Sequence, residues 1–269
     1  MDEDMEYMIK ETVQIVRDAS RLMVHPPVLG VEQKGNDSNY VTEADLAVQR
    51  YLTEKLLALL PGSGMLGEEG EHEKTDGSLL WVVDPIDGTS NFIRDIGFSG
   101  ISVGLVRGGE PVMGVIFNPY RDEMYRAFEG GGAFLNENPI HVSDRDFSHS
   151  HLCSAMSLYD KRFAKQCFNI IERVYNRADD LRRMGTASLE LALLAAGRVE
   201  LYFEMRLFPW DVAAAIPIIK EAGGYVRLLH HDHFVLDKPF PFVAANNREN
   251  FESLLEIVCD EIPVIPYDE

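Results

Sequence analysis

Residues 81–92 read Trp81-Val82-Val83-Asp84-Pro85-Ile86-Asp87-Gly88-Thr89-Ser90-Asn91-Phe92, an apolar run followed by a turn that carries two acids. The run predicts a buried strand over residues 79–84 with Asp84 at its carboxyl end, where open α/β sheets bind their ligands. Pro85 has no N–H for a sheet ladder, and Gly88 permits a backbone turn that is closed to most other residues. Asp84 and Asp87 can therefore converge on one cation cluster beside the Thr89 hydroxyl, although two acids that only cap backbone groups fit the same pattern.

Three other acids are candidates for the same site. Asp45 ends the segment Val41-Thr42-Glu43-Ala44-Asp45, Glu68 lies in Gly67-Glu68-Glu69-Gly70, and Asp211 follows Trp210 at the start of an expected helix. Each has an ordinary alternative when it is taken alone. An acid such as Asp211 is favoured in the first turn of any helix by the macrodipole, and Glu68 suits a solvated loop.

The first half of the chain predicts helices on one side of a largely antiparallel sheet. Apolar periodicity indicates a helix over residues 5–23, and a polar stretch over 32–40 indicates a loop or short hairpin. Thr42 is the expected N-cap of a second helix that ends near residue 60, with Asp45 at its third position. The remaining strands of this half are expected at 98–106, 111–118 and 123–129.

The second half alternates strands and helices, which predicts a sheet sandwiched between helices. Pro217 is expected to kink the helix in which it lies. The boundary between the halves is placed near residues 143–151, giving an N-terminal α+β half over 1–145 and a C-terminal α/β half over 146–269. The expected strands are 152–156, 181–184, 199–204, 225–229 and 242–245, and the expected helices are 161–175, 187–196, 210–222 and 248–259.

Charge and cysteine content limit the partners and the location. The 269 residues carry a formal net charge of −19, so nucleic acid and anionic membranes are not expected partners. An anionic substrate remains compatible, because bound divalent cations invert the local field. The three cysteines form no C-x-x-C pair, and neither a signal peptide nor a membrane-spanning run is recognisable. A cytoplasmic location is therefore expected.

The four acidic motifs together resemble those of the inositol monophosphatase family, which belongs to a superfamily of metal-dependent, lithium-sensitive phosphatases. The resemblance extends from the first helix to the turn at Gly223-Gly224. It implies an α/β (α+β) fold, a layered α-β-α-β-α sandwich of the inositol monophosphatase and fructose-1,6-bisphosphatase type, in which both halves form one compact catalytic unit. It also implies a homodimer. The motifs are V-T-E-A-D, G-E-E, W-V-V-D-P-I-D-G-T-S-N-F and W-D-V-A-A-A-x(5)-E-A-G-G.

The resemblance also implies a binding site for two to three Mg²⁺ ions. The first ion would be held by Glu68, Asp84 and the Ile86 carbonyl, the second by Asp84, Asp87 and Asp211, and a weaker third near Glu68. Catalytic roles fall to Asp45, Glu68 and Thr89, with Thr89 bonded to Asp45 and orienting the attacking water. Lys34 would lie on a loop that closes over the site. Carboxylate and carbonyl oxygens are the ligands that Mg²⁺ prefers.

Substrate recognition follows from the same resemblance. Glu204, seven residues before Asp211, occupies the place where the family's inositol phosphatases bind sugar hydroxyls, although a solvated strand end is its ordinary alternative. Phe208-Pro209 before Trp210 and Ser90 after Thr89 depart from the family pattern without removing a metal ligand. The implied substrate-binding residues are Asp87, Gly88, Thr89, Arg182, Gly185, Thr186, Ala187, Glu204 and Asp211.

The expected activity is Mg²⁺-dependent hydrolysis of inositol 1-phosphate by direct attack of an activated water, without a phosphoenzyme. A cluster of such ions can both activate water and neutralise a leaving alkoxide. Related activities on fructose 1,6-bisphosphate, histidinol phosphate or 3′-phosphoadenosine 5′-phosphate are the enzymatic alternatives. A regulatory binding protein that keeps the fold without the chemistry is the alternative from another class.

Overall fold

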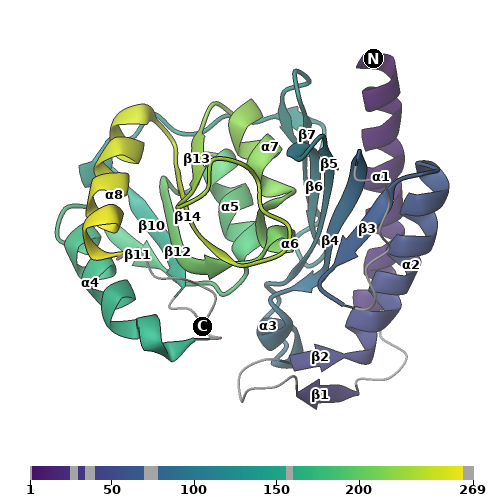
Figure 1. Ribbon diagram of the computed structural model, residues 1–269, viewed down its shortest axis with the longest axis horizontal. Coiled ribbons are helices and arrows are strands. Elements are labelled where there is room, and N and C mark those ends of the chain that lie inside the picture. Colours follow the sequence, from purple (N-terminus) through teal and green to yellow (C-terminus); the bar gives the residue numbers. More distant parts are fainter. Residues whose placement is uncertain (1, 25–29, 34–39, 70–77, 156–159, 263–269) are drawn as a thin grey trace.

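The computed structural model describes residues 2–24, 30–33, 40–69, 78–155 and 160–262, which form five layers of helices and sheets (Figure 1). Two separate apolar cores lie on the outer sides of the two sheets, and a third core fills the space between the sheets. The expected layered sandwich is thus confirmed. In order, the layers are helices α1 (Asp2–Val24) and α2 (Glu43–Leu59), a seven-stranded sheet, helices α5 (Ala187–Ala195), α6 (Pro209–Val212) and α7 (Ala215–Glu221), a five-stranded sheet, and helices α4 (Ala164–Tyr175) and α8 (Arg248–Glu261).

The seven-stranded sheet is antiparallel except at its first pair. β3, which the sequence did not predict, runs parallel to β4. The long helices of the first half, α1 and α2, pack on one face as expected, and α5, α6 and α7 of the second half pack on the other face. The strands, in spatial order, are β3 (Gly64–Gly67), β4 (Leu79–Asp87), β5 (Gly100–Arg107), β6 (Glu110–Asn118), β7 (Glu123–Phe128), β8 (Ala133–Leu135) and β9 (Asn138–Pro139).

The five-stranded sheet is mixed. β10 runs parallel to both of its neighbours, whereas β14 is antiparallel to β12 and β13. The strands, in spatial order, are β11 (Asp180–Arg182), β10 (His151–Ala155), β12 (Leu201–Leu207), β14 (Phe240–Ala245) and β13 (Tyr225–Leu228). Beside the two sheets lie a short hairpin, β1 (Val31–Gln33) with β2 (Tyr40–Thr42), and the five-residue helix α3 (Thr89–Ile93).

The single helix expected over residues 210–222 is two helices, and that prediction is wrong. The break lies at residues 213–214, one turn before Pro217. Pro217 has no N–H to donate to the Ala213 carbonyl, and its ring crowds the residue four positions earlier. The break also lies close to the sheet, since a Cβ on Gly114 would stand 1.9 Å from the Ala214 carbonyl oxygen. This approach fixes where α6, and with it Asp211, stands above the seven-stranded sheet.

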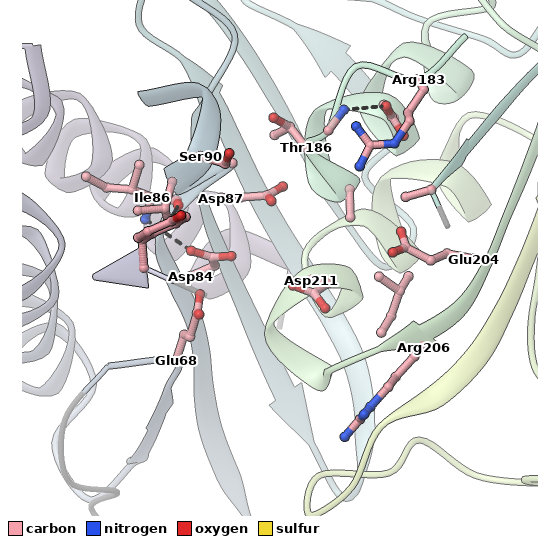
Figure 2. Close-up of a pocket in the computed structure, with 18 residues that line it drawn as sticks. Glu68, Asp84, Ile86, Asp87, Ser90, Arg183, Thr186, Glu204, Arg206 and Asp211 are labelled. Carbon is pink, nitrogen blue, oxygen red and sulfur yellow. Dashed lines mark hydrogen bonds between the residues drawn. The ribbon is translucent and has the colours of Figure 1, made fainter. Parts of the chain in front are cut away.

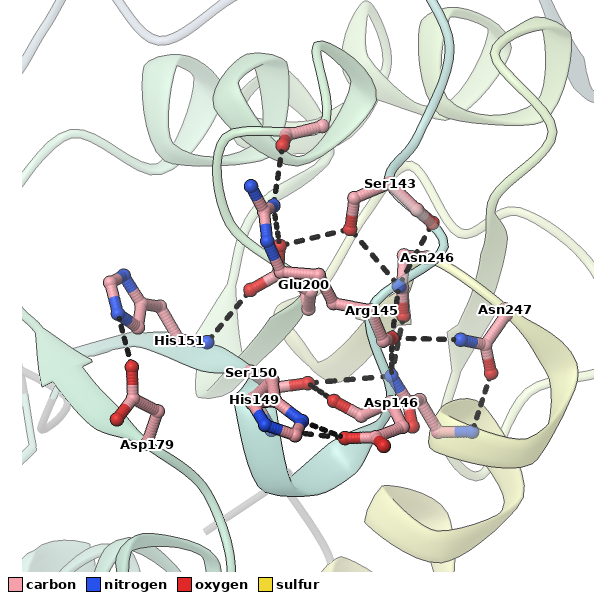
Figure 3. Close-up of polar contacts among 12 residues, drawn as sticks. Ser143, Arg145, Asp146, His149, Ser150, His151, Asp179, Glu200, Asn246 and Asn247 are labelled. Carbon is pink, nitrogen blue, oxygen red and sulfur yellow. Dashed lines mark hydrogen bonds and ion pairs between the residues drawn. The ribbon is translucent and has the colours of Figure 1, made fainter.

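A network of polar contacts fastens the expected boundary segment to the second sheet (Figure 3). Its centre is the buried carboxylate of Glu200, which accepts hydrogen bonds from Ser143 Oγ at 2.9 Å, Arg145 Nη1 at 2.8 Å and the His151 N–H at 2.8 Å. The Asn246 side chain donates to the Arg145 carbonyl at 2.9 Å. The network therefore sets the position of β10 beside β12, and β12 carries part of the site described below.

Within the described ranges, no helix has both the length and the apolar character needed to cross a membrane.

Candidate active site

The end of β4 carries two buried acids, each of which accepts a hydrogen bond from a backbone N–H (Figure 2). Asp84 Oδ1 accepts from the Ile86 N–H at 3.1 Å, and Asp87 Oδ2 accepts from the Ser188 N–H at 2.7 Å. The ladder between β4 and β5 shifts between these acids, because Asp84 pairs with Ser102 and Asp87 with Gly100. Strand β4 thus continues past Pro85 to Asp87 instead of ending at Asp84. Pro85 lies in the bulge, where the ladder is interrupted. A bulge re-aims side chains, here so that both acids line the same cleft.

Asp45 and Thr89 come together as the sequence predicted. Thr42 caps α2 in a capping box with Asp45, whose Oδ2 accepts from the Thr42 N–H at 2.8 Å. The Thr89 hydroxyl lies 3.0 Å from the Ile86 carbonyl oxygen and 3.4 Å from Asp45 Oδ1. Its single proton can serve either acceptor, and its lone pairs stay available to a water. Thr89 also begins α3, whose N-cap Gly88 has a φ of +85°.

Glu68 and Asp211 complete the acidic wall of the cleft. Glu68 follows β3, and its N–H bonds the Val83 carbonyl at 3.0 Å, which holds it next to the end of β4. Asp211 stands in the first turn of α6 and accepts from the Phe208 N–H at 2.6 Å. In Figure 2 the side chains of Asp84, Asp87 and Asp211 lie around one space between the two sheets.

Burial and mutual repulsion make these acids hard to ionise without a cation. Burial first, and then the charges of Glu68, Asp87, Asp211 and Asp45, raise the pKa of Asp84 well above its usual value. Burial and the charge of Asp87 likewise raise the pKa of Asp211 well above the usual range. Burial raises the pKa of both Asp45 and Asp87 to about 6. Bound cations would offset both the burial and the mutual repulsion of these carboxylates, so the group favours cation binding.

The donors of this wall fit Mg²⁺. They are carboxylates, a backbone carbonyl and a hydroxyl, and no His or Cys is among the described residues that line the cleft. Hard oxygen ligands of this kind suit Mg²⁺, whereas zinc sites use nitrogen and sulfur. Across the described residues no three Asp, Glu, His or Cys side chains already enclose one ion position. Asp84, Asp87 and Asp211 each accept a backbone N–H through one carboxylate oxygen.

The opposite wall contains the predicted substrate residues. Gly185 and Thr186, just before α5, and Ala187, its first residue, line the cleft. Thr186 Oγ1 donates to the Phe98 carbonyl at 2.9 Å, which ties this segment to the region of β4 and α3. Glu204 of β12 also lines the cleft and is buried rather than solvated. Its Oε2 accepts from the Tyr202 hydroxyl at 2.8 Å, and burial raises its pKa to about 8.

A model of the inositol monophosphatase family matches residues 3–262. The chain belongs to this family. The inositol-1-monophosphatase of Rhizobium meliloti is 42% identical over 199 residues, 73% of this chain and 74% of that protein. The Nus factor SuhB of Escherichia coli K12 is 35% identical over 265 residues, 96% of this chain and 98% of that protein. The crystal structure of the extragenic suppressor protein suhB from Bartonella henselae superposes with a TM-score of 0.87 at 32% identity, covering 95% of this chain and all of that one.

This family member differs from the sequence expectation at its arginines. Arg182, the predicted substrate residue, bonds the side chain of Asp180 and the Leu181 carbonyl, and it does not line the cleft. Arg183 and Arg206 do. The dipeptide Arg182-Arg183 alone cannot show which side chain turns inward, because consecutive residues at a strand end point to opposite sides. Lys34 lies outside the described residues, so its role stays a prediction.

Glu190 is a further cleft residue that sequence reasoning missed. It lies on α5, and its Oε1 accepts from the Met184 N–H at 2.5 Å and the Gly185 N–H at 3.0 Å. Burial raises its pKa to about 7. Glu190 thus holds the segment that presents Thr186 and Ala187 to the cleft. Phe208 does not line the cleft and instead stacks on Trp210, with ring centroids 5.0 Å apart.

The metal-free protein is expected to lose stability as the pH rises from about 4 to about 8. Burial raises the folded-state pKa of Glu204 from 4.5 to about 8 and that of Asp87 from 3.8 to about 6. A raised folded-state pKa means that the folded chain holds more protons than the unfolded one. The resulting stabilisation is complete below the unfolded pKa and disappears as the pH rises through the folded pKa.

Thermal unfolding in a chelator measures this effect. The midpoint is expected to fall by about 5 °C across that pH interval, and Mg²⁺ is expected to raise it most at the upper end. The matched control is Glu256→Gln, which removes an exposed carboxylate of α8 and is expected to leave the pH dependence unchanged. A midpoint that rises with pH in the chelator would contradict the prediction.

Proposed function

We propose that this chain is an Mg²⁺-dependent phosphomonoesterase that hydrolyses inositol 1-phosphate. The observation that carries the proposal is the gathering of buried acids on one side of a cleft whose other side presents a buried Glu204. The acids supply hard ligands, and Glu204 can accept hydrogen bonds from the hydroxyls of a leaving polyol. The relative from Rhizobium meliloti that bears the name inositol-1-monophosphatase supports the same choice.

Glu68, Asp84, the Ile86 carbonyl, Asp87 and Asp211 would hold two to three Mg²⁺ ions. Bound Mg²⁺ lowers the pKa of a water and stabilises a leaving alkoxide. Thr89, whose hydroxyl lies 3.4 Å from Asp45 Oδ1, orients the attacking water. Asp45 would accept the proton that this water loses. Gly88 and Thr89 line the cleft at the start of α3, and their N–H groups would bind phosphate oxygens. Hydrolysis then proceeds by in-line attack without a phosphoenzyme.

A substrate panel tests the proposal. Phosphate release is measured from inositol 1-phosphate, fructose 1,6-bisphosphate, histidinol phosphate and 3′-phosphoadenosine 5′-phosphate, each with Mg²⁺ and with a chelator. We expect release only with Mg²⁺ and the highest kcat/KM for inositol 1-phosphate. Faster release from the nucleotide or from histidinol phosphate would contradict the substrate assignment. Release that persists in the chelator would contradict the metal assignment.

The same panel decides the non-enzymatic alternative. Relatives that cover nearly this whole chain are named Nus factor SuhB, and that name describes a factor rather than a phosphatase. A folded chain that released no phosphate from any of the four compounds would favour such a binding role. Inhibition by Li⁺, a homodimer and a cytoplasmic location remain predictions, which inhibition kinetics, sedimentation and localisation of the tagged chain would test.

A further inference from the structure

Strand β12 contains an irregularity directly beside Glu204. Its ladder with β14 pairs Glu204 with Phe242 and then Leu207 with Phe240, so two residues on β12 face one on β14. In a regular strand, consecutive residues point to opposite faces. Here Arg206 and Leu207 both line the cleft, together with Glu204. Glu204 and Arg206 are two positions apart and so share the face of β12 that lines the cleft, and the extra residue of the bulge turns Leu207 to that face as well.

Arg206 has hydrogen-bonding capacity to spare. Its Nε is buried and has no acceptor among the described residues. The ion pair of its Nη1 with Asp160 is long, at 3.7 Å, and that carboxylate already accepts from Arg162 Nε at 2.9 Å and Nη2 at 2.7 Å. The guanidinium also lies 5.7 Å from the centre of the Phe208 ring, and the Arg206 side chain is 27% exposed. A guanidinium of this kind binds a planar or tetrahedral oxyanion through two donors.

The position of Arg206 separates it from the proposed site of the scissile phosphate. In the view of Figure 2, Asp87, Ser90 and Thr186 lie on one side of Glu204 and Asp211, and Arg206 lies on the other. A phosphate bound at Gly88 and Thr89 would therefore leave Arg206 facing the alcohol that departs. The distance between the two groups in a substrate must span the width of the cleft across Glu204.

We propose that Arg206 is a specificity-determining residue that binds a second anionic group on the leaving alcohol. This inference rests on the proposed phosphatase function and deepens it. The substrates that gain from this contact are phosphorylated sugars or polyols that bear another phosphate or a carboxylate, whereas inositol 1-phosphate has no second anion and binds without it. Water forms the new bond to the scissile phosphorus, the alcohol oxygen leaves with a proton, and the second anionic group stays on the product. Arg206 contributes to binding and not to the bond-breaking step.

Two matched substrate pairs test the inference. Fructose 1,6-bisphosphate differs from fructose 1-phosphate only by its second phosphate, and 6-phosphogluconate differs from sorbitol 6-phosphate only by a carboxylate in place of the hydroxymethyl group at the far end of the chain. The wild-type chain is expected to show a higher kcat/KM for the doubly anionic member of at least one pair, by about 10- to 100-fold. A charge-assisted hydrogen bond to the second anion strengthens binding by about this factor. Arg206→Gln is expected to remove this preference through KM, with the singly anionic member changed by less than about threefold. The responding pair identifies the second anion as phosphate or carboxylate.

Control variants separate this role from a structural one. Arg248→Gln removes the same charge from an exposed site on α8 and is expected to keep the full preference. Arg206→Lys keeps the charge but not the forked geometry, and it is expected to keep part of the preference for the doubly anionic substrate. This variant tests the same inference if Arg206→Gln does not fold. The inference is overturned if wild type shows no preference in either pair, or if Arg206→Gln lowers both members of a pair equally. Absence of Mg²⁺-dependent release from all four compounds and from inositol 1-phosphate overturns the proposed function as well.

Discussion

Replacing Asp84 by Asn is expected to lower kcat for Mg²⁺-dependent phosphate release roughly a thousandfold or more, because Mg²⁺ ions held by Asp84 would supply several kcal/mol of transition-state stabilisation. Asp84 stands at the end of β4 and is the acid whose ionisation is opposed by four neighbouring carboxylates at once. Bound cations would therefore ease the ionisation of Asp84 more than that of the other acids. An amide has similar size and accepts the same Ile86 N–H bond, so the loss should come from chemistry and not from misfolding.

A stability measurement gives the same variant a second, opposite readout. Without metal, the buried Asp84 carboxylate is a cost to the folded state, and the amide removes that cost. Asp84→Asn is therefore expected to unfold at a higher temperature than wild type in a chelator at about pH 8, and to gain less from Mg²⁺. Asp122→Asn, at an exposed acid that pairs with Arg17 at 2.6 Å, is the matched control and should change neither readout strongly. A variant with near wild-type kcat would show that the metal assignment is wrong.

The parts of the site that the sequence predicted are those with local signals. The strand before Asp84, the turn at Gly88 and the Thr42 cap with Asp45 depend on residues within a few positions of one another. Their backbone conformations follow from chain chemistry alone: apolar runs, a missing proline N–H and a short capping side chain. Alternating strands and helices predicted the sheet between helices in the second half, whereas the five layers followed from the resemblance to the inositol monophosphatase family.

The parts that the sequence missed depend on partners far along the chain. β3 has only four residues and includes two glycines, so its strand conformation comes from parallel pairing with β4. The position of Leu207 beside Arg206 on the cleft depends on a bulge against β14, which neither residue type nor spacing predicts. Asp87 was expected as a metal ligand, but its hydrogen bond to Ser188 also links β4 to α5 across 101 positions. Tertiary packing sets such contacts, and the periodicity of apolar residues in the sequence does not predict them.

Replacing Gly88 by Ala is expected to lower kcat/KM about 100-fold, the loss that a misplacement of about 1 Å can cause. Gly88 has a φ of +85°, and an added Cβ would stand 2.3 Å from Thr186 Oγ1 and 3.3 Å from the Gly185 carbonyl oxygen. Thr186 cannot yield freely, because its hydroxyl is bonded to the Phe98 carbonyl at 2.9 Å. The strain must move the turn that carries the proposed phosphate-binding N–H groups, or the facing substrate segment.

Gly62 provides a control with nearly the same backbone conformation. Its φ is +88°, yet no atom lies within 4 Å of an added Cβ, so Gly62→Ala carries the left-handed strain without the collision. Both variants should lose a similar amount of stability from the backbone, measured by chemical denaturation. Only Gly88→Ala should lose activity, because only there does the added methyl group displace the cleft. Equal activity of the two variants would show that the turn at Gly88 tolerates displacement, and the assignment of its N–H groups to the phosphate would then be untenable.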